Sequence, residues 1–169
     1  GFLWIGTEHG IQRFDGRKFI SFRFGGLENS LPPFGVDQIL DAGNGRMWIR
    51  QGTEIGQYDP VSFKYYKVQA SPDQQRTSNT NLSISSDSKG NIYLCSRQSE
   101  LMCYDRETNS FTNKKIPIKI PEGWLVSHLY EDTTEHKYYI CSDSGLAVYD
   151  DITKELQYRD RNPANKGNT

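Results

Sequence analysis

The chain has 169 residues, of which 35% are hydrophobic, and its mean hydropathy is −0.73. Its formal net charge of −1 and its pI near 6.3 provide no basic surface of the kind that binds nucleic acid, so we expect no nucleic acid partner for this segment. No apolar run approaches the roughly 20 residues that cross a bilayer, so we expect no membrane contact within it either.

Four aromatic-led segments recur along the chain, with starts 44, 45 and 46 residues apart. They are Trp4-Ile5-Gly6-Thr7, Trp48-Ile49-Arg50-Gln51, Tyr93-Leu94-Cys95-Ser96 and Tyr139-Ile140-Cys141-Ser142. A second series holds nearly the same period and consists of Phe14-Asp15, Tyr58-Asp59, Tyr104-Asp105 and Tyr149-Asp150. A period of about 40–50 residues with several strands in each unit indicates the blades of a β-propeller.

The second unit shows the order of elements most clearly. Val36–Leu40 alternates as a half-buried strand, and Asp41–Gly45 has the Gly and Asn residues that favour a turn. Met47–Arg50 and Glu54–Tyr58 form the next two strands, and Phe63–Val68 is the outermost one. Because the connecting turns are short, the strands must be antiparallel.

The same order recurs in the third and fourth units, whereas the first lacks its innermost strand. We therefore predict an all-β fold, a β-propeller fragment with three complete four-stranded antiparallel blades plus a partial first blade. The expected boundaries are 1–24 for blade 1, 36–68 for blade 2, 82–116 for blade 3, 126–160 for blade 4 and 161–169 for a tail. The phase of the repeat favours a segment of a longer propeller, with exposed edges.

Residues required once in each blade are interpreted as structural. The aspartates Asp15, Asp59, Asp105 and Asp150 are expected to accept hydrogen bonds from the turn before each outer strand. The aromatics of the first series, Trp4, Trp48, Tyr93 and Tyr139, are expected to be structural, with the tryptophans packed between blades. Cys95 and Cys141 share one repeat position and are expected to be small, buried residues. No metal or cofactor pattern stands out.

The segment Phe2–Asp15 resembles the two-component regulator propeller repeat, whose pattern reads roughly l-W-I-G-T-x-x-G-l-x-r-f-d. The connector Gly26–Leu31, leading to Val36, is similar to that family's link between blades. The second unit departs from the pattern, because Arg50 and Gln51 replace the Gly-Thr pair.

The resemblance implies the periplasmic sensor region of a hybrid two-component system of the Bacteroidetes type. By this resemblance the segment is expected to be non-catalytic, to bind a glycan-derived ligand or a partner, and to signal by dimer rearrangement to a histidine kinase. The membrane helix and the kinase would lie outside these 169 residues.

Residues that do not repeat are the candidates for ligand binding. Trp124 and Phe34 precede innermost strands, where loops line one rim of a propeller and an aromatic ring can stack on a sugar; packing between blades is the alternative. Arg50 and Gln51 break the repeat, and His128 either faces the channel or is structural. The expected ligand is an oligosaccharide.

Two other functions remain open. A propeller enzyme, such as a lyase or a glycan-active enzyme, would need groups like His9, His128 and Glu122 to converge. A protein-interaction scaffold of the WD40 kind would carry a Trp-Asp ending, where this chain has Phe-Asp or Tyr-Asp. We also expect self-association through an exposed edge, with Phe2–Thr7 or Leu156–Tyr158 pairing with a second copy.

Overall fold

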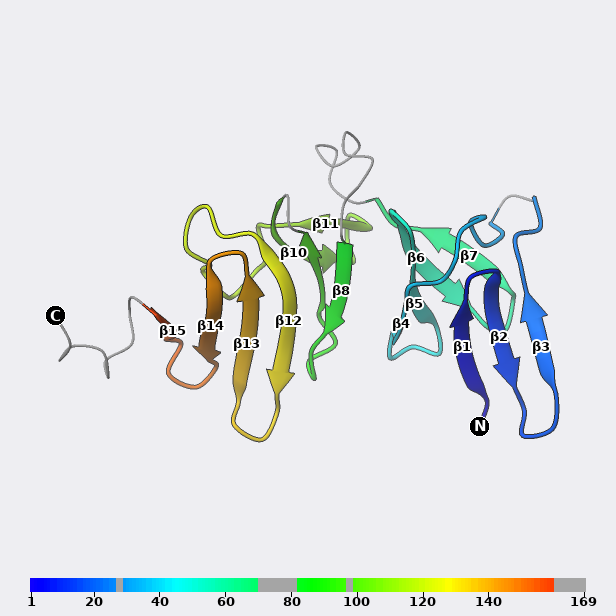
Figure 1. Cartoon of the computed structure of the whole chain (residues 1–169), viewed down its shortest axis with the longest axis horizontal. Helices are drawn as coiled ribbons and strands as arrows, with labels where there is room; N and C mark the ends of the chain where they lie inside the picture. Colours follow the sequence, from blue (N-terminus) through cyan, green and yellow to red (C-terminus); the bar gives the residue numbers. More distant parts are fainter. Residues whose placement is uncertain (27–28, 70–81, 97–98, 160–169) are drawn as a thin grey trace, which may run out of the picture. The chain divides into compact units, whose positions relative to one another are not determined.

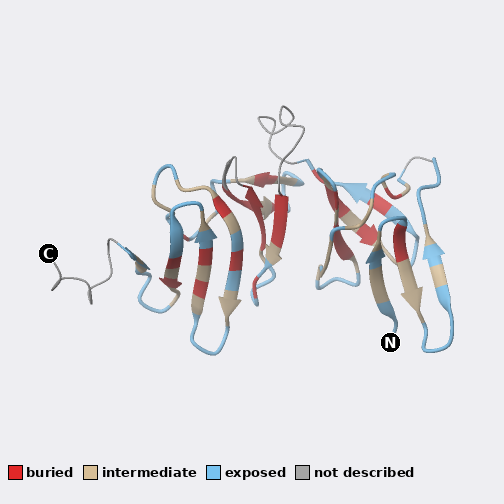
Figure 2. Ribbon diagram, in the orientation of Figure 1, coloured by how far each residue is buried: buried red, intermediate tan, exposed pale blue. Residues whose placement is uncertain are grey.

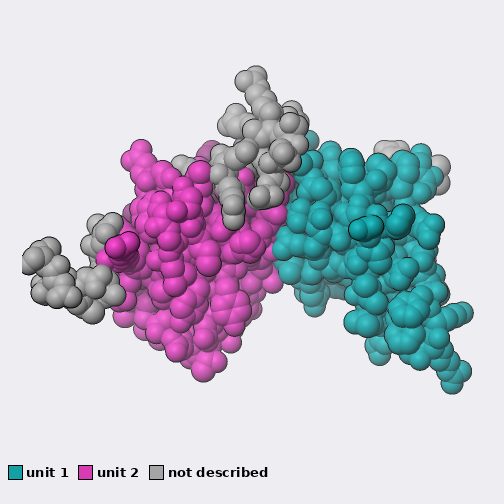
Figure 3. Space-filling view, in the orientation of Figure 1, with its two compact units in different colours: residues 1–78 teal, residues 79–169 magenta. Residues whose placement is uncertain are grey.

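Short antiparallel strands joined in sequence order make up the chain (Figure 1). The structure is a computed structural model that describes residues 1–26, 29–69, 82–96 and 99–159. It divides into two units, residues 1–78 and residues 79–169 (Figure 3), and each is described by itself. Leu27 and Glu28 of the predicted connector and the predicted tail 161–169 lie outside the described residues. The described part of the chain has no helix long and apolar enough to cross a bilayer.

The first unit contains a three-stranded and a four-stranded sheet. The three-stranded sheet consists of β1 (Leu3–Thr7), β2 (Gly10–Phe14) and β3 (Phe19–Phe22). The four-stranded sheet consists of β4 (Gln38–Asp41), β5 (Met47–Gln51), β6 (Glu54–Asp59) and β7 (Lys64–Lys67). Each sheet is an antiparallel meander in sequence order, as the short turns require.

The second unit contains two four-stranded meanders. One consists of β8 (Leu82–Ser86), β9 (Ile92–Ser96), β10 (Ser99–Asp105) and β11 (Ser110–Thr112). The other consists of β12 (Val126–Asp132), β13 (Lys137–Ser142), β14 (Gly145–Asp150) and β15 (Leu156–Tyr158). The predicted all-β class, with one three-stranded and three four-stranded blades, is therefore confirmed for the residues that the structure describes.

The two repeating sequence series describe one geometric relationship in all four sheets. Each aromatic of the first series pairs, across the two central strands, with the residue just before the aromatic of the second series. The pairs are Trp4 with Arg13, Trp48 with Gln57, Tyr93 with Cys103 and Tyr139 with Val148. Register is fixed in this way because a slip by one residue would move every side chain to the opposite face.

The aspartates of the second series organise the turn that follows. Asp15 Oδ1 accepts hydrogen bonds from the backbone N–H groups of Arg17 (2.8 Å) and Lys18 (2.9 Å). Equivalent bonds join Asp59 to Val61 and Ser62, Asp105 to Glu107, and Asp150 to Ile152 and Thr153. The backbone bonds lower the pKa of Asp15, Asp59 and Asp150, and for Asp105 the Lys115 ammonium is the largest cause.

The core of the first unit lies between its two sheets (Figure 2). Trp4 of the first sheet packs there, with its ring centroid 6.2 Å from that of Tyr58 in the second sheet. Gly6 lies so close to the second sheet that an added Cβ would be 2.7 Å from Val36 Cγ1. β4 begins at Gln38 rather than at the predicted Val36. The N–H of Val36, just before this strand, donates to Thr7 O of the first sheet.

The core of the second unit explains why one prediction about the cysteines is wrong. Cys95 is fully buried in the core between the two sheets, whereas Cys141 is exposed. Successive side chains of a strand point to opposite faces, and Ile140 is fully buried in that core. Cys141 therefore lies on the other face of β13, which no sheet among the described residues of this unit covers. The half-buried Tyr139 shares that face.

Candidate functional site

Trp124 is presented by a tight turn in the link between β11 and β12. The Trp124 N–H donates to Pro121 O (3.2 Å), and Gly123 between them has φ +82°. This combination is typical of a type II turn, whose third position needs a positive φ and therefore favours glycine. The Pro-Glu-Gly-Trp sequence thus places an aromatic ring at a defined point just before an innermost strand.

Trp124 lines a pocket of about 380 Å³ within the second unit. The apolar lining consists of Leu101, Ile116, Ile118, Ile120, Pro121 and Trp124. Leu101 and Ile118 are buried at 2% and 3% exposure, so they form the floor. This volume is within the range of about 300–1,000 Å³ that is usual for small-molecule sites.

Polar side chains complete the pocket, and all of them come from the same link. They are Asn113, Lys119 and Glu122. Lys119 and Glu122 are exposed and make no ion pair with one another or with other described residues. The pocket therefore offers an aliphatic floor, one aromatic wall and donors and acceptors near solvent, the pattern of a site for an amphipathic small molecule.

Tyr158 of β15 fixes the orientation of the indole. Its ring packs edge to face against Trp124, with centroids 5.1 Å apart and an interplanar angle of 65°. Such pairs are favoured by the aromatic quadrupole and contribute about 0.5–1.5 kcal/mol beyond the area that they bury. The half-buried Trp124 is thus held in place before any ligand arrives.

In the first unit, Gln51 is a structural residue that shapes a loop. Its side chain is fully buried, and Nε2 donates to Pro32 O (3.1 Å) and Phe34 O (2.5 Å). Its Oε1 is buried without a partner among the described residues. Phe34 is 51% exposed on this loop. Gln51 therefore cannot touch a ligand, but it sets the backbone that presents Phe34.

The Arg50 guanidinium is also already bound to neighbouring groups of the chain. Nη1 forms an ion pair with Asp37 Oδ2 (3.0 Å) and donates to Gly52 O (3.0 Å), and Nε donates to Gln38 Oε1 (3.0 Å). The side chain is 16% exposed. A ligand would have to displace these contacts before the guanidinium could bind it.

The residues proposed for an enzymatic role are not joined. His128 is exposed on β12, on the opposite face from the buried Val126 side of the sheet, whereas Glu122 lines the pocket. His9 lies in the exposed turn between β1 and β2, in the other unit. Among the described residues, there is no hydrogen bond between His128 and Glu122. No group of three or more His, Cys, Asp and Glu side chains there could hold a metal ion.

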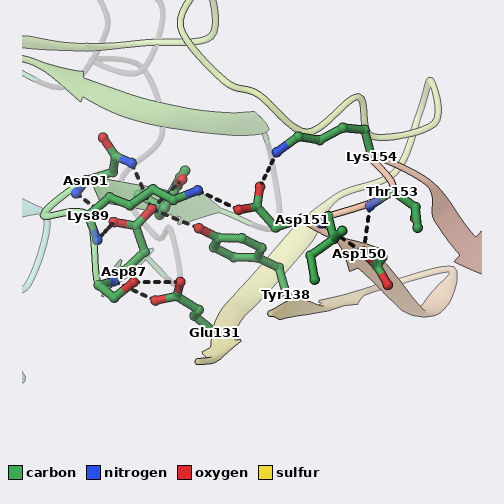
Figure 4. Close-up of polar contacts among 12 residues, drawn as sticks. Asp87, Lys89, Asn91, Glu131, Tyr138, Asp150, Asp151, Thr153 and Lys154 are labelled. Carbon is green, nitrogen blue, oxygen red and sulfur yellow. Dashed lines mark hydrogen bonds and ion pairs between the residues drawn. The ribbon is translucent and has the colours of Figure 1, made fainter. Parts of the chain in front are cut away.

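A cluster of polar side chains in the second unit surrounds Asp87, in the turn between β8 and β9 (Figure 4). Its carboxylate accepts hydrogen bonds from the phenol groups of Tyr93 (2.9 Å) and Tyr138 (3.2 Å), and from the side chain and N–H of Asn91 (2.8 Å each). Tyr138 belongs to the neighbouring sheet, so Asp87 joins the two sheets.

Further bonds between the same sheets flank Asp87, from Lys89 to Asp151 and from Ser88 to Glu131. Figure 4 shows the Lys89 and Lys154 ammonium groups reaching opposite oxygens of Asp151, at 2.6 and 2.8 Å. Glu131 of β12 accepts a bond from the Ser88 hydroxyl (2.9 Å). Tyr93 and Tyr138 are 0% and 2% exposed, and burial raises the pKa of both phenols. Asp87 and the two phenols at the centre of the cluster are buried, and their bonds join the two blades.

Of the residues that line the pocket, Trp124 and Glu122 are also candidates from the sequence, and the others are not. Ile116, Ile118 and Ile120 alternate in the link, a pattern that already indicates one apolar side. Leu101 lies on β10 and joins them only through the fold.

No family model matches the sequence, and no curated protein matches it. Solved structures do. One, described as the extracellular domain of the hybrid two component system BT3049 from B. thetaiotaomicron, is 20% identical with a TM-score of 0.67 over 94% of this chain. A second, from system BT4673 of the same organism, is 17% identical with a TM-score of 0.64 over 93% of the chain. This chain spans 23% of the length of each.

The WD40 domain of Pan2 from Neurospora crassa is also similar, at 16% identity and a TM-score of 0.58 over 93% of this chain. At such identities a likeness shows the fold alone. The propeller architecture is therefore confirmed, and the two bacterial neighbours agree with the family that Phe2–Asp15 resembles.

Proposed function

We propose that this chain is part of the extracellular or periplasmic sensor region of a hybrid two-component system. The observation that carries the proposal is the likeness to two extracellular domains of such systems over more than nine-tenths of the chain. The resemblance of Phe2–Asp15 to the two-component regulator propeller repeat supports it independently, because that resemblance depends on the sequence alone.

In this role the chain binds an oligosaccharide and catalyses no reaction. The pocket beside Trp124 supports ligand binding, since it combines a pre-oriented aromatic ring with polar groups. The separation of His128 from Glu122 gives no support to an acid–base pair. The signal passes by dimer rearrangement to a histidine kinase elsewhere in the longer protein.

Self-association is part of this proposal. β1 pairs with β2 on one side, and β15 pairs with β14 on one side, so each has a second edge without a strand partner among the described residues. Leu3 on β1 is 59% exposed. Such edges can accept a strand of a second copy. Light scattering that shows a strict monomer at high concentration would exclude this arrangement.

The experiment that tests the function uses the full-length gene product in lipid vesicles. Its autophosphorylation is measured with and without an oligosaccharide pool on the propeller side. We expect the rate to change with the pool, and we expect Trp124→Ala to raise the concentration needed. The matched control is Phe24→Ala, because Phe24 is 53% exposed and outside the pocket. A gene product without kinase activity would refute the proposal.

A further inference from the structure

The floor of the Trp124 pocket is more apolar than an ordinary sugar requires. Leu101 and Ile118 close it from below, and Ile116 and Ile120 are half-buried on either side of Ile118 in the link. None of these side chains can donate or accept a hydrogen bond. A hydroxyl group placed on this floor would lose its hydrogen bonds to water without replacement, which is unfavourable.

The rest of the pocket lining suits a sugar ring and its hydroxyl groups. The indole of Trp124 offers a flat surface for the C–H face of a sugar ring, and Asn113, Lys119 and Glu122 offer polar groups for its hydroxyls. One side of the pocket therefore suits a pyranose ring, while its floor suits a small alkyl group. A single ligand satisfies both only if the ring carries such a group.

We infer that the pocket binds a sugar bearing a methyl group, as in an N-acetylated amino sugar or a 6-deoxy sugar, with the methyl on the isoleucine floor and the ring against Trp124. This inference rests on the proposed ligand-sensing function and specifies its ligand. The volume of about 380 Å³ accommodates one such residue with room for part of a neighbour.

The test is a titration of the 169-residue chain with four free, reducing monosaccharides, followed by tryptophan fluorescence and by protein-detected NMR. The set is glucose, glucosamine, N-acetylglucosamine and 6-deoxyglucose, so each comparison changes one substituent. Burying one methyl group predicts about fourfold tighter binding than glucose. Tight N-acetylglucosamine with weak 6-deoxyglucose identifies an N-acetyl ligand, and the reverse identifies a 6-deoxy ligand.

The floor is tested with Ile116→Thr, which keeps the branch at Cβ but replaces the ethyl group with a hydroxyl. We expect this variant to bind the methylated sugar and glucose with nearly equal affinity. The control Ile152→Thr, at a position 70% exposed and outside the pocket, should still bind the methylated sugar more tightly than glucose. Should Ile116→Thr not fold, the wild-type affinities for N-acetylglucosamine and for 6-deoxyglucose, each relative to glucose, still decide.

Two results would overturn the inference. One is glucose binding as tightly as both methylated sugars, and the other is no binding of any of the four. Neither bears on kinase activation by oligosaccharides, which the vesicle experiment measures separately.

Discussion

The Tyr138 hydroxyl donates a hydrogen bond to Asp87 Oδ2 across 3.2 Å, and this bond joins the two sheets of the second unit. Asp87 receives bonds from its own sheet as well, through Tyr93 and Asn91. If the Tyr138 hydroxyl is removed, the Asp87 carboxylate keeps its hydrogen bonds to Tyr93 and Asn91. The contribution of the bond between the blades can therefore be measured separately.

We predict that Tyr138→Phe lowers the free energy of unfolding by about 1.5 kcal/mol, the low end of the range for a hydrogen bond to a charged group. Urea denaturation measures the change. The control is Tyr139→Phe, because the Tyr139 hydroxyl reaches only the exposed Glu135, at 3.5 Å. Equal losses in the two variants would show that the Asp87 bond contributes nothing specific.

Gly56 lies where the chain cannot accept a side chain. A Cβ at this position would be 2.5 Å from both Tyr65 Cζ and the backbone Tyr66 O. The carbonyl belongs to the paired strand β7 and cannot move away without disrupting the sheet. Gly56→Ala should therefore cost about 1–3 kcal/mol or more. Gly25→Ala, whose Cβ would meet nothing closer than 3.7 Å, should be nearly neutral. Thermal melts of both variants check this, and a stable Gly56→Ala would contradict the predicted close contact.

Gln51 should be needed for the loop that carries Phe34. Gln51→Met has a similar volume but leaves Pro32 O and Phe34 O without their donor, so we expect a loss of about 1–2 kcal/mol. Loss of the unpaired Oε1 offsets part of this cost. The half-exposed Gln12, which donates only to Ser21 Oγ at 3.3 Å, provides the control Gln12→Met. Hydrogen exchange of residues 31–37 should increase in Gln51→Met but not in Gln12→Met. Unchanged exchange in Gln51→Met would show that Gln51 does not hold the loop in place.

Acid should destabilise the folded chain through the repeated aspartates. The pKa of Asp59 is below its usual 3.8 in the folded state, chiefly because its carboxylate accepts the Val61 N–H. A lowered folded pKa stabilises the fold above the unfolded value, and this contribution disappears as pH falls through the folded value. Stability should therefore decrease below about pH 4.

The variant Asp59→Asn isolates this effect, because asparagine does not ionise in that range. Its melting temperature should fall less steeply than that of the wild type between about pH 4 and 2. Glu8→Gln, at an exposed turn residue, is the control for loss of a carboxylate. Parallel slopes for wild type and Asp59→Asn would rule out Asp59 as a contributor.

The blades were predictable because the same local rules apply four times. Trp48 and Tyr58-Asp59 fix a strand pair and the turn after it, and both depend on residues close in sequence. The side chains that do not repeat were harder to place. Gln51 is polar, and only the carbonyls of a loop 17 and 19 residues earlier make its burial favourable.

The burial predicted for Cys141 from the repeat was wrong for a related reason. A repeat specifies which face of a strand a residue occupies, but burial depends on what covers that face. Cys95 has a neighbouring sheet over it, whereas Cys141 is exposed. The pocket is only partly predictable from the sequence. The alternation of Ile116, Ile118 and Ile120 is visible in the sequence, whereas the contribution of Leu101 from β10 depends on the fold.

Native mass spectrometry of the chain in an oligosaccharide pool tests the central claim most directly, because it reports binding and turnover together. Ligand binding without catalysis predicts complexes whose added mass equals an intact oligosaccharide, with the pool unchanged over time. Shortened or unsaturated products would contradict the account in favour of an enzyme, and the absence of any complex would contradict ligand binding by this segment.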